Sequence, residues 1–318
     1  MAVINVDDIY ILGETGAQVD KVTGLFTKDE NTDAGEKAFA QLNIGTAGSN
    51  RNLLDNPWFT VNQREFTSVT GTNGVKTVDR WEVNNGGGTG GTISVTSEGY
   101  ISLVTGSAYI SYQEKFGKDE LAGKTVTMSI NDDGNIYSYS FTVPARTEST
   151  QIGGSFIFKE GCRCNFFVMP QSSAYGYNFQ ISVEQGYSAT IRAVKLELGS
   201  VSTLANDAPP RYKSELDDCN FYCRVLKGNL YNATGIAVAS TQVRFTLPYQ
   251  MYKQPTPSFS GTIRVLGTGG FLAVSAVAVS GWSESNVEIA CTVSGATTYA
   301  PYFLSIGDNS QIVLSADL

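Results

Sequence analysis

Apolar and polar residues alternate over short stretches in most of the chain. In the segment KTVTMSI, Val126, Met128 and Ile130 would share one face of a strand, with hydroxyl residues on the other face. This period of two is typical of a strand with one buried face. Similar runs, rich in Val, Ile, Thr and Tyr and separated by Gly, Asn and Asp, recur from residue 51 onward. The pattern predicts an all-β fold in which Asp133 and Gly134 form a hairpin turn.

Two segments have the pattern of a short helix instead. Asp33 and Glu36 match a capping box for a helix that Gly45 would end. Ser214 and Asp217 match a second capping box, for a helix that would continue to about residue 226. The apolar side of the first helix would consist of Ala34, Ala38 and Leu42, and that of the second helix of Leu216, Cys219, Cys223 and Leu226.

These elements divide the chain into three parts. Residues 1–50 carry one predicted helix and are too few to bury a core of their own, so this segment needs a partner surface. Residues 51–205 form the first β region. Pro209 and Pro210 then interrupt the strand pattern before it resumes within residues 206–318. We therefore predict two β-sandwich domains after a short N-terminal segment.

The composition excludes several classes of function. With 30 acidic and 22 basic residues the net charge is -8, which argues against a nucleic-acid partner. The chain has no histidine, so a Ser-His-Asp triad, a Cys-His pair and His-ligated zinc are excluded. The longest apolar run, at 271–279, is too short to insert into a membrane as a helix. The first residues lack the pattern of a secretory signal, so we expect synthesis and folding in a cytoplasm.

Cysteine spacing bears on metal binding and on redox state. The chain has an odd number of cysteines, five, which indicates reduced thiols in the absence of a secretory signal. The pairs Cys162/Cys164 and Cys219/Cys223 lack the C-x-x-C spacing of a zinc knuckle, and Cys291 stands apart. We predict buried free thiols, no bound metal and no cofactor.

Asp132 and Asp133 bring two carboxylates together in the segment NDDGN. A carboxylate pair can catalyse glycoside hydrolysis, but adjacent residues of a tight turn point apart. Carboxylates are also preferred ligands of calcium, although no further acidic partner can be identified from the sequence. We expect a solvated turn here and keep a calcium site as the alternative.

Several segments, in order along the chain, resemble bacteriophage tail-fibre and receptor-binding proteins. NLLDNPWFTVNQR at 52–64 resembles the N-L-L-x-N-x-x-F-x-x-x-Q-R opening of a fibre β domain, and Asp79-Arg80-Trp81 resembles the recurrent D-R-W of these proteins. Residues 109–130 resemble the jelly rolls of carbohydrate-binding modules. The other matching segments are AFAQLNIGTAG, VKLELGSVST followed by PPRYKSELDDCNFYCRVL, FTLPYQMYKQPTPSFSG and IVLSADL.

This resemblance implies a fold, partners and a location. Both β domains are expected to be jelly-roll-like sandwiches in a homotrimer, and an axis of three helices would bury the two apolar helix faces. Residues 1–50 would attach the chain to other phage structural proteins, so the expected location is the virion, after synthesis in the host cytoplasm. The ligand would be a polysaccharide of the host surface, which makes the chain a non-enzymatic receptor-binding protein that mediates host attachment.

Three other functions fit parts of the sequence. A capsid fibre, collar fibre or decoration protein would share the same modules and differ only in its place on the particle. A bacterial carbohydrate-binding protein would need a secretion signal, which the first residues do not show. A glycan-cleaving spike would be expected to carry long β-helix repeats with clustered carboxylates, and the sequence shows no such repeat.

The expected ligand-binding residues lie in two loops of the C-terminal domain, the domain that would be distal in a fibre of this orientation. Aromatic residues in these loops would stack on sugar rings, and polar residues would bind sugar hydroxyls. As an alternative, the aromatic rings pack into the ends of the sandwich or into a subunit interface. The candidate residues are Trp282, Ser283, Glu284 and Asn286 in the first loop, and Tyr299 and Tyr302 in the second.

Polar and aromatic residues near the start of the first β domain have structural roles in our interpretation. Trp81 is expected to pack in the core, with Arg80 paired to an acid. Asn52, Asn56 and Gln63 are expected to bind backbone groups where the chain enters the domain.

Overall fold

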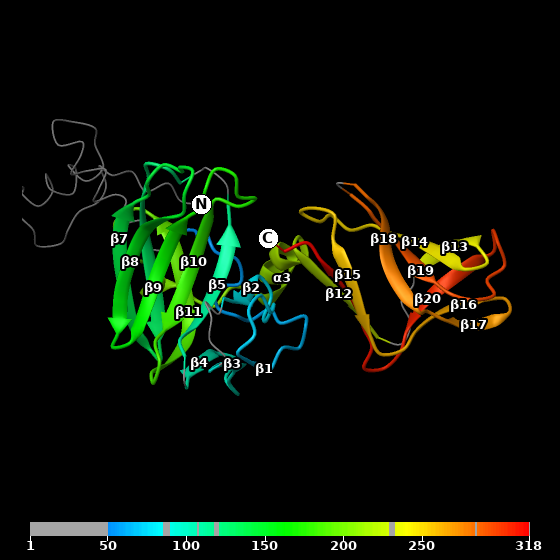
Figure 1. The fold of residues 1–318 in the computed structure, drawn as a ribbon, viewed down its shortest axis with the longest axis horizontal. Coiled ribbons are helices and arrows are strands. Elements are labelled where there is room, and N and C mark those ends of the chain that lie inside the picture. Colours follow the sequence, from blue (N-terminus) through cyan, green and yellow to red (C-terminus); the bar gives the residue numbers. More distant parts are fainter. Residues whose placement is uncertain are drawn as a thin grey trace, which may run out of the picture.

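The computed structural model describes residues 50–84, 90–106, 108–117, 121–228, 233–283 and 285–317. The predicted helix between Asp33 and Gly45, with its Ala34/Ala38/Leu42 stripe, lies outside the described residues. The described chain is mostly β, as the alternating pattern predicts, with its strands in four antiparallel sheets (Figure 1).

Two of these sheets pack face to face in the first sandwich. One has six strands, in the order β1 (Ser68–Thr70), β3 (Gly91–Val95), β4 (Ile101–Thr105), β11 (Ser188–Leu198), β6 (Thr125–Asp132) and β7 (Asn135–Thr142). The other has five strands, in the order β2 (Trp81–Val83), β5 (Ile110–Phe116), β10 (Tyr177–Val183), β9 (Cys162–Val168) and β8 (Gln151–Lys159).

The remaining two sheets form the second sandwich. A three-stranded sheet has the order β12 (Cys223–Lys227), β21 (Gln311–Ser315) and β15 (Thr256–Ser260). A seven-stranded sheet has the order β17 (Gly270–Ala273), β16 (Ile263–Gly267), β20 (Pro301–Ile306), β13 (Thr234–Ala239), β14 (Gln242–Leu247), β19 (Val287–Thr292) and β18 (Ala276–Trp282). The 3-10 helix η2 (Leu204–Asn206) and helix α3 (Tyr212–Asn220) lie between the two pairs of sheets in sequence.

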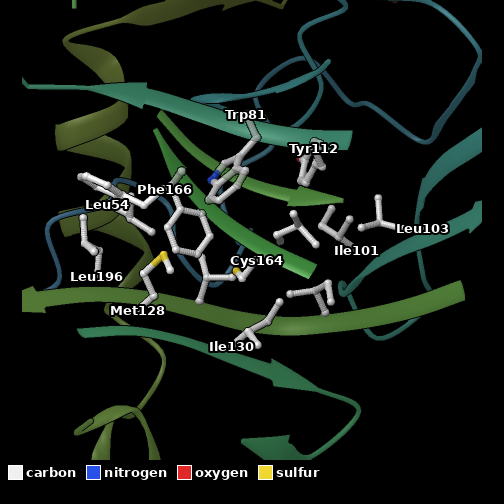
Figure 2. Close-up of a cluster of buried hydrophobic side chains, with 14 of the residues drawn as sticks. Leu54, Trp81, Ile101, Leu103, Tyr112, Met128, Ile130, Cys164, Phe166 and Leu196 are labelled. Carbon is white, nitrogen blue, oxygen red and sulfur yellow. The ribbon is translucent and has the colours of Figure 1, made fainter. Parts of the chain in front are cut away.

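The core of the first sandwich is built from alternate residues of facing strands. Val126, Met128 and Ile130 of β6 are fully buried, as their spacing predicts. Trp81 approaches from the five-stranded sheet and stacks on Tyr112, with 5.1 Å between ring centroids. Figure 2 shows Trp81, Tyr112, Met128 and Ile130 among the side chains that fill the space between the two sheets. Trp81 is therefore a core residue, as expected.

The turn between β6 and β7 confirms the predicted hairpin. Asp133 and Gly134 both have positive φ angles, 47° and 94°, as a two-residue turn between twisted strands requires. Asp132 pairs with Asn135 on either side of the turn. Local sequence is sufficient to place this turn because Asp and Gly tolerate the left-handed backbone.

The outward side of β6 is also buried, which the alternating pattern does not predict. Ser129 bonds to Ser202 at 2.7 Å between hydroxyl oxygens, and Thr127 donates to the carbonyl of Gly199 at 2.8 Å. The chain that follows β11 thus folds back over the sheet. Beneath it the ammonium of the fully buried Lys195 pairs with Asp207 at 2.8 Å.

The second predicted helix is wrong beyond residue 220. Helix α3 covers Tyr212–Asn220, and its N-cap is Arg211 without a side-chain cap bond, so the Ser214 capping box does not form. Cys223 and Leu226 lie in strand β12 instead, because this segment pairs with β21 along its whole length. The four apolar residues predicted for one helix face therefore do not share one, and they give no support to a three-helix axis.

A buried set of charged side chains joins the two sandwiches. Figure 1 shows α3 and the C-terminal end of the chain in the region between the sandwiches. The guanidinium of Arg80 pairs with Asp55 at 3.0 Å and lies 3.6 Å from the ring centroid of Tyr222. Glu114 and Asp317 also lie within ion-pair distance of Arg80. Arg80 is thus paired with acids from both sandwiches. The expectation that Arg80 pairs with an acid is confirmed.

The asparagine and glutamine residues at the start of the first sandwich bind backbone groups, as expected. Asn52 donates to the carbonyl of Val194 at 2.9 Å. Asn56 donates to the carbonyls of Val61 and Asp79, at 2.8 and 2.9 Å. Gln63 reaches the second sandwich, where its amide donates to the carbonyl of Cys223 at 2.9 Å. These contacts fix the chain entry and contribute to the junction between the sandwiches.

Candidate functional site

The outward side of the five-stranded sheet carries a regular array of polar side chains. Strands β5, β9 and β10 each turn alternate residues to the core, and every second residue lies on the opposite side of the sheet. Most of the polar side chains on that side are themselves buried, with exposed fractions of 2% for Ser111, 4% for Gln113 and 8% for Gln180. Asn and Gln are uncommon in strands, so several of them on one surface need an explanation. We call this surface the amide face; its residues on these three strands are Ser111, Gln113, Lys115, Arg163, Asn165, Phe167, Asn178, Gln180 and Ser182.

The pairing register aligns the amide face in three rows across the sheet. In the middle row Gln180 lies between Gln113 and Asn165. The rows on either side place Lys115, Asn178 and Phe167 together, and Ser111, Ser182 and Arg163 together. Adjacent side chains in such rows are close enough to interact.

Hydrogen bonds between neighbouring side chains hold the amide face in place. Gln113 donates to Glu82 at 2.7 Å and accepts from Asn178 at 2.6 Å and from Asn84 at 2.9 Å. Within the described residues, the buried Oδ1 atom of Asn178 has no hydrogen-bond partner. The network restricts the rotamers of its members, which lowers the entropy cost of binding a ligand.

The amide face is hollowed by two adjoining pockets. One, of about 250 Å³, is lined by Tyr109 and Arg163 among others; the other, of about 400 Å³, is lined by Lys115 and Tyr175. Gln180 lines both pockets, so the two lie side by side, and we refer to them together as the depression. Tyr109 is 42% exposed, so part of its ring can contact a ligand.

The charges around the larger pocket are partly neutralised. Glu82 accepts from Lys76 and from Lys115, each at 2.6 Å. Burial acts to raise the pKa of Glu82, but the two lysines outweigh it and hold this pKa below its ordinary value. Lys115 also lies 5.3 Å from the ring centroid of Tyr175. This arrangement presents ionised groups with fixed positions and a local excess of positive charge.

The residues expected to bind ligand in the second sandwich have different environments. Trp282 is 41% exposed and Tyr299 is 83% exposed. Tyr302 is only 5% exposed, and its hydroxyl accepts the backbone N–H of Thr297 at 2.9 Å, so its ring offers no face to a ligand. Ser283 and Asn286 bond to one another across a turn, and Glu284 lies outside the described residues.

The two exposed aromatic residues lie at opposite ends of the seven-stranded sheet. Trp282 pairs with Val287, the residue that pairs with Leu247 at the end of β14. Tyr299 instead donates its N–H to Ala237, near the other end of β14. The structure therefore does not bring Trp282 and Tyr299 into one site, whereas it aligns the amide face across three strands.

The candidate metal and catalytic groups are bound to protein partners. Asp132 accepts from Lys159 at 2.9 Å, and Asp133 accepts from Arg192 at 2.6 Å. Among the described residues, no three Cys, Asp or Glu side chains are grouped so that they could hold a metal ion. All five cysteines are buried free thiols, as predicted.

Comparisons with known proteins leave the function to be argued from the site itself. No family model matches the chain, and no curated protein is similar to it in sequence. Within the described ranges, no helix combines the length and the apolar character needed to cross a membrane.

Proposed function

We propose that the chain is a non-catalytic glycan-binding protein, and that the amide face holds the glycan. The observation that carries this proposal is the aligned set of amide and hydroxyl side chains that line the two adjoining pockets. Each amide offers both a donor and an acceptor, as a sugar hydroxyl does. A surface of this kind suits a ligand with many hydroxyls and few apolar groups.

Aromatic side chains at the two ends of the depression complete the fit. Tyr109 lines the smaller pocket and Tyr175 the larger one. Sugar rings stack on aromatic faces through their C–H bonds, and a tyrosine provides such a face together with a polar end. Two rings separated by a row of amides suit an oligosaccharide better than a single sugar.

The setting we propose for this activity is a phage virion fibre, most simply a tail fibre that attaches to glycan on the host surface. The ordered set of fibre-like segments supports this setting, and so does a junction that fixes two sandwiches to one another. Homotrimer formation and attachment through residues 1–50 are parts of the same proposal. A capsid or collar fibre, a decoration protein and a bacterial carbohydrate-binding protein would differ in location.

The proposal is tested by binding of the full chain to an array of bacterial surface glycans. Gln180→Ala removes a side chain that lines both pockets, and we expect it to weaken binding at least about tenfold. Trp282→Ala is the matched control on the second sandwich and should bind normally. Both variants are compared with the wild type by thermal melting, which detects loss of the fold.

Three results would count against the amide face. Normal binding by a folded Gln180→Ala variant would exclude its central role. Loss of binding only in Trp282→Ala would transfer the site to the C-terminal loops. Failure of the wild-type chain to bind any glycan would reject the proposed function. Labelled chain on particles, located by electron microscopy, tests the virion setting separately.

A further inference from the structure

We infer that the glycan held on the amide face carries a carboxylate, and that Arg163 is the residue that binds it. This inference rests on the proposed function and adds the chemical class of the ligand. Arg163 projects from β9 into the smaller pocket, in the row that also contains Ser111 and Ser182.

The guanidinium of Arg163 differs from the buried guanidinium groups of this protein. Arg80 and Arg64 are each paired with carboxylates at the junction between the sandwiches. Among the described residues, the guanidinium of Arg163 donates one hydrogen bond, from NH1 to the hydroxyl of Ser155 at 3.3 Å, and no carboxylate lies within ion-pair distance of it. The guanidinium of Arg163 thus lines the smaller pocket beside amide and hydroxyl side chains, and the one carboxylate of that pocket among the described residues, Glu184, does not pair with it.

The surroundings of Arg163 suit a planar anion. A guanidinium binds a carboxylate through two parallel hydrogen bonds, which adds geometric selectivity to the charge attraction. Ser111 and Ser182 lie next to it, with 3.0 Å between their hydroxyl oxygens. Because Ser182 donates its proton to Gln180, Ser111 donates to Ser182 and keeps an acceptor lone pair for a hydroxyl of the same ligand. Because the whole chain carries a net charge of -8, an anionic ligand needs a local cation of this kind to bind.

Glu184 limits the ligand to a small negative charge. This carboxylate lines the same pocket as Arg163 without pairing with it. It would repel a doubly charged phosphate or sulfate-rich ligand, whereas it can accept a hydrogen bond from a sugar hydroxyl. A sugar acid with one carboxylate and free hydroxyls satisfies both side chains.

The test uses an array of oligosaccharides that contain uronic or other sugar acids, each beside the same oligosaccharide with its carboxyl group reduced to an alcohol. We expect the full chain to bind acidic members at least about tenfold more tightly than their reduced partners. Arg163→Gln, which keeps donors but loses the charge, should abolish that difference. Arg163→Lys should restore only part of it, because an ammonium lacks the planar fork.

Controls separate this inference from the proposed function. Glu184→Gln should keep or increase the preference for acidic members, since it removes the one negative charge of the pocket. The inference would be overturned if the wild-type chain bound acidic and reduced members equally, and if this binding were lost in Gln180→Ala but kept in Arg163→Gln. The proposed function would then still stand. Preference for phosphorylated or sulfated members would also overturn it. Binding to no member would reject both.

Discussion

Arg64 and Asp317 lie 253 positions apart in the chain, yet NH2 of Arg64 donates to Oδ2 of Asp317 at 2.5 Å. The Asp317 side chain is almost fully buried, and it also lies near Arg80. Burial acts to raise the pKa of Asp317, but the neighbouring cations outweigh it and hold this pKa below its ordinary value. One carboxylate from the second sandwich thus faces two guanidinium groups of the first.

Replacing Asp317 should loosen the junction. Asp317→Asn leaves Arg64 and Arg80 with less negative charge, and loss of one partner from a buried ion pair costs about 3–5 kcal/mol. We expect the free energy of unfolding in urea to fall by about that amount. Asp308→Asn is the matched control, since Asp308 is exposed in a turn of the same sandwich. Equal stability of the two variants would mean that the junction does not depend on Asp317.

Asp79 should make the stability of the fold depend on pH. Burial raises the pKa of Asp79 to about 6 from 3.8, although Arg64 opposes the shift. Between these pH values the folded chain holds a proton that the unfolded chain has lost. The stabilising contribution of Asp79 to the free energy of unfolding is therefore complete below the unfolded pKa of 3.8 and is lost as the pH rises to about 6. The free energy of unfolding changes by roughly 3 kcal/mol over this range.

The Asp79→Asn variant isolates this contribution. Subtracting its free energy of unfolding from that of the wild type cancels groups that titrate in the opposite sense, such as Asp317. We expect the free energy of unfolding of the wild type, minus that of Asp79→Asn, to decrease as the pH rises from 4 to 7. A difference that stays constant over this range would show that Asp79 is ionised throughout.

The thiols should resist modification in the folded chain. Burial raises the pKa of Cys162 to about 11 and that of Cys291 to about 12, and it raises the other three as well. At pH 8 even Cys162 would then be thiolate in only about one molecule per thousand. A thiol reagent should label the native chain slowly, whereas it should label all five cysteines of the chain unfolded in guanidinium. Fast labelling that persists in Cys162→Ser would contradict this.

Tyr302 and Trp282 should differ in their effect on stability. Tyr302 is packed in the second core, so Tyr302→Ala should cost about 3–5 kcal/mol and lower the melting temperature strongly. Tyr302→Phe removes only the acceptor of the Thr297 N–H and should cost about 1 kcal/mol. Trp282→Ala should cost less than Tyr302→Ala, because its ring is partly exposed at the sheet edge. Differential scanning calorimetry gives the order directly.

Local pattern predicts much of this fold. The alternation around Met128 predicts a strand with one buried face, and the Asp133-Gly134 turn depends only on residues within it. The same reasoning fails at Cys223, where a spacing that suits a helix face is overridden by pairing of β12 with β21, about 90 residues later in the chain.

The amide face depends on register rather than on local pattern. Gln113, Asn165 and Gln180 are aligned only because β10 pairs with both β5 and β9. Alternating polar residues in SYQEK and YNFQIS are visible in the sequence and could have indicated an outward polar surface. Which of them share a row follows from strand order, which a single sequence does not contain.

Two neighbouring connections, one covalent and one made of ion pairs, hold the second sandwich against the first. The chain passes from α3 into β12, and the adjacent strand β21 leads back to Asp317 beside Arg64 and Arg80. A single linker would allow the second sandwich to rotate relative to the first. Two neighbouring connections restrict this rotation. A force applied sideways to the seven-stranded sheet would therefore be transmitted to the first sandwich through the paired strands β12 and β21, and the two sandwiches would move together as one rigid body.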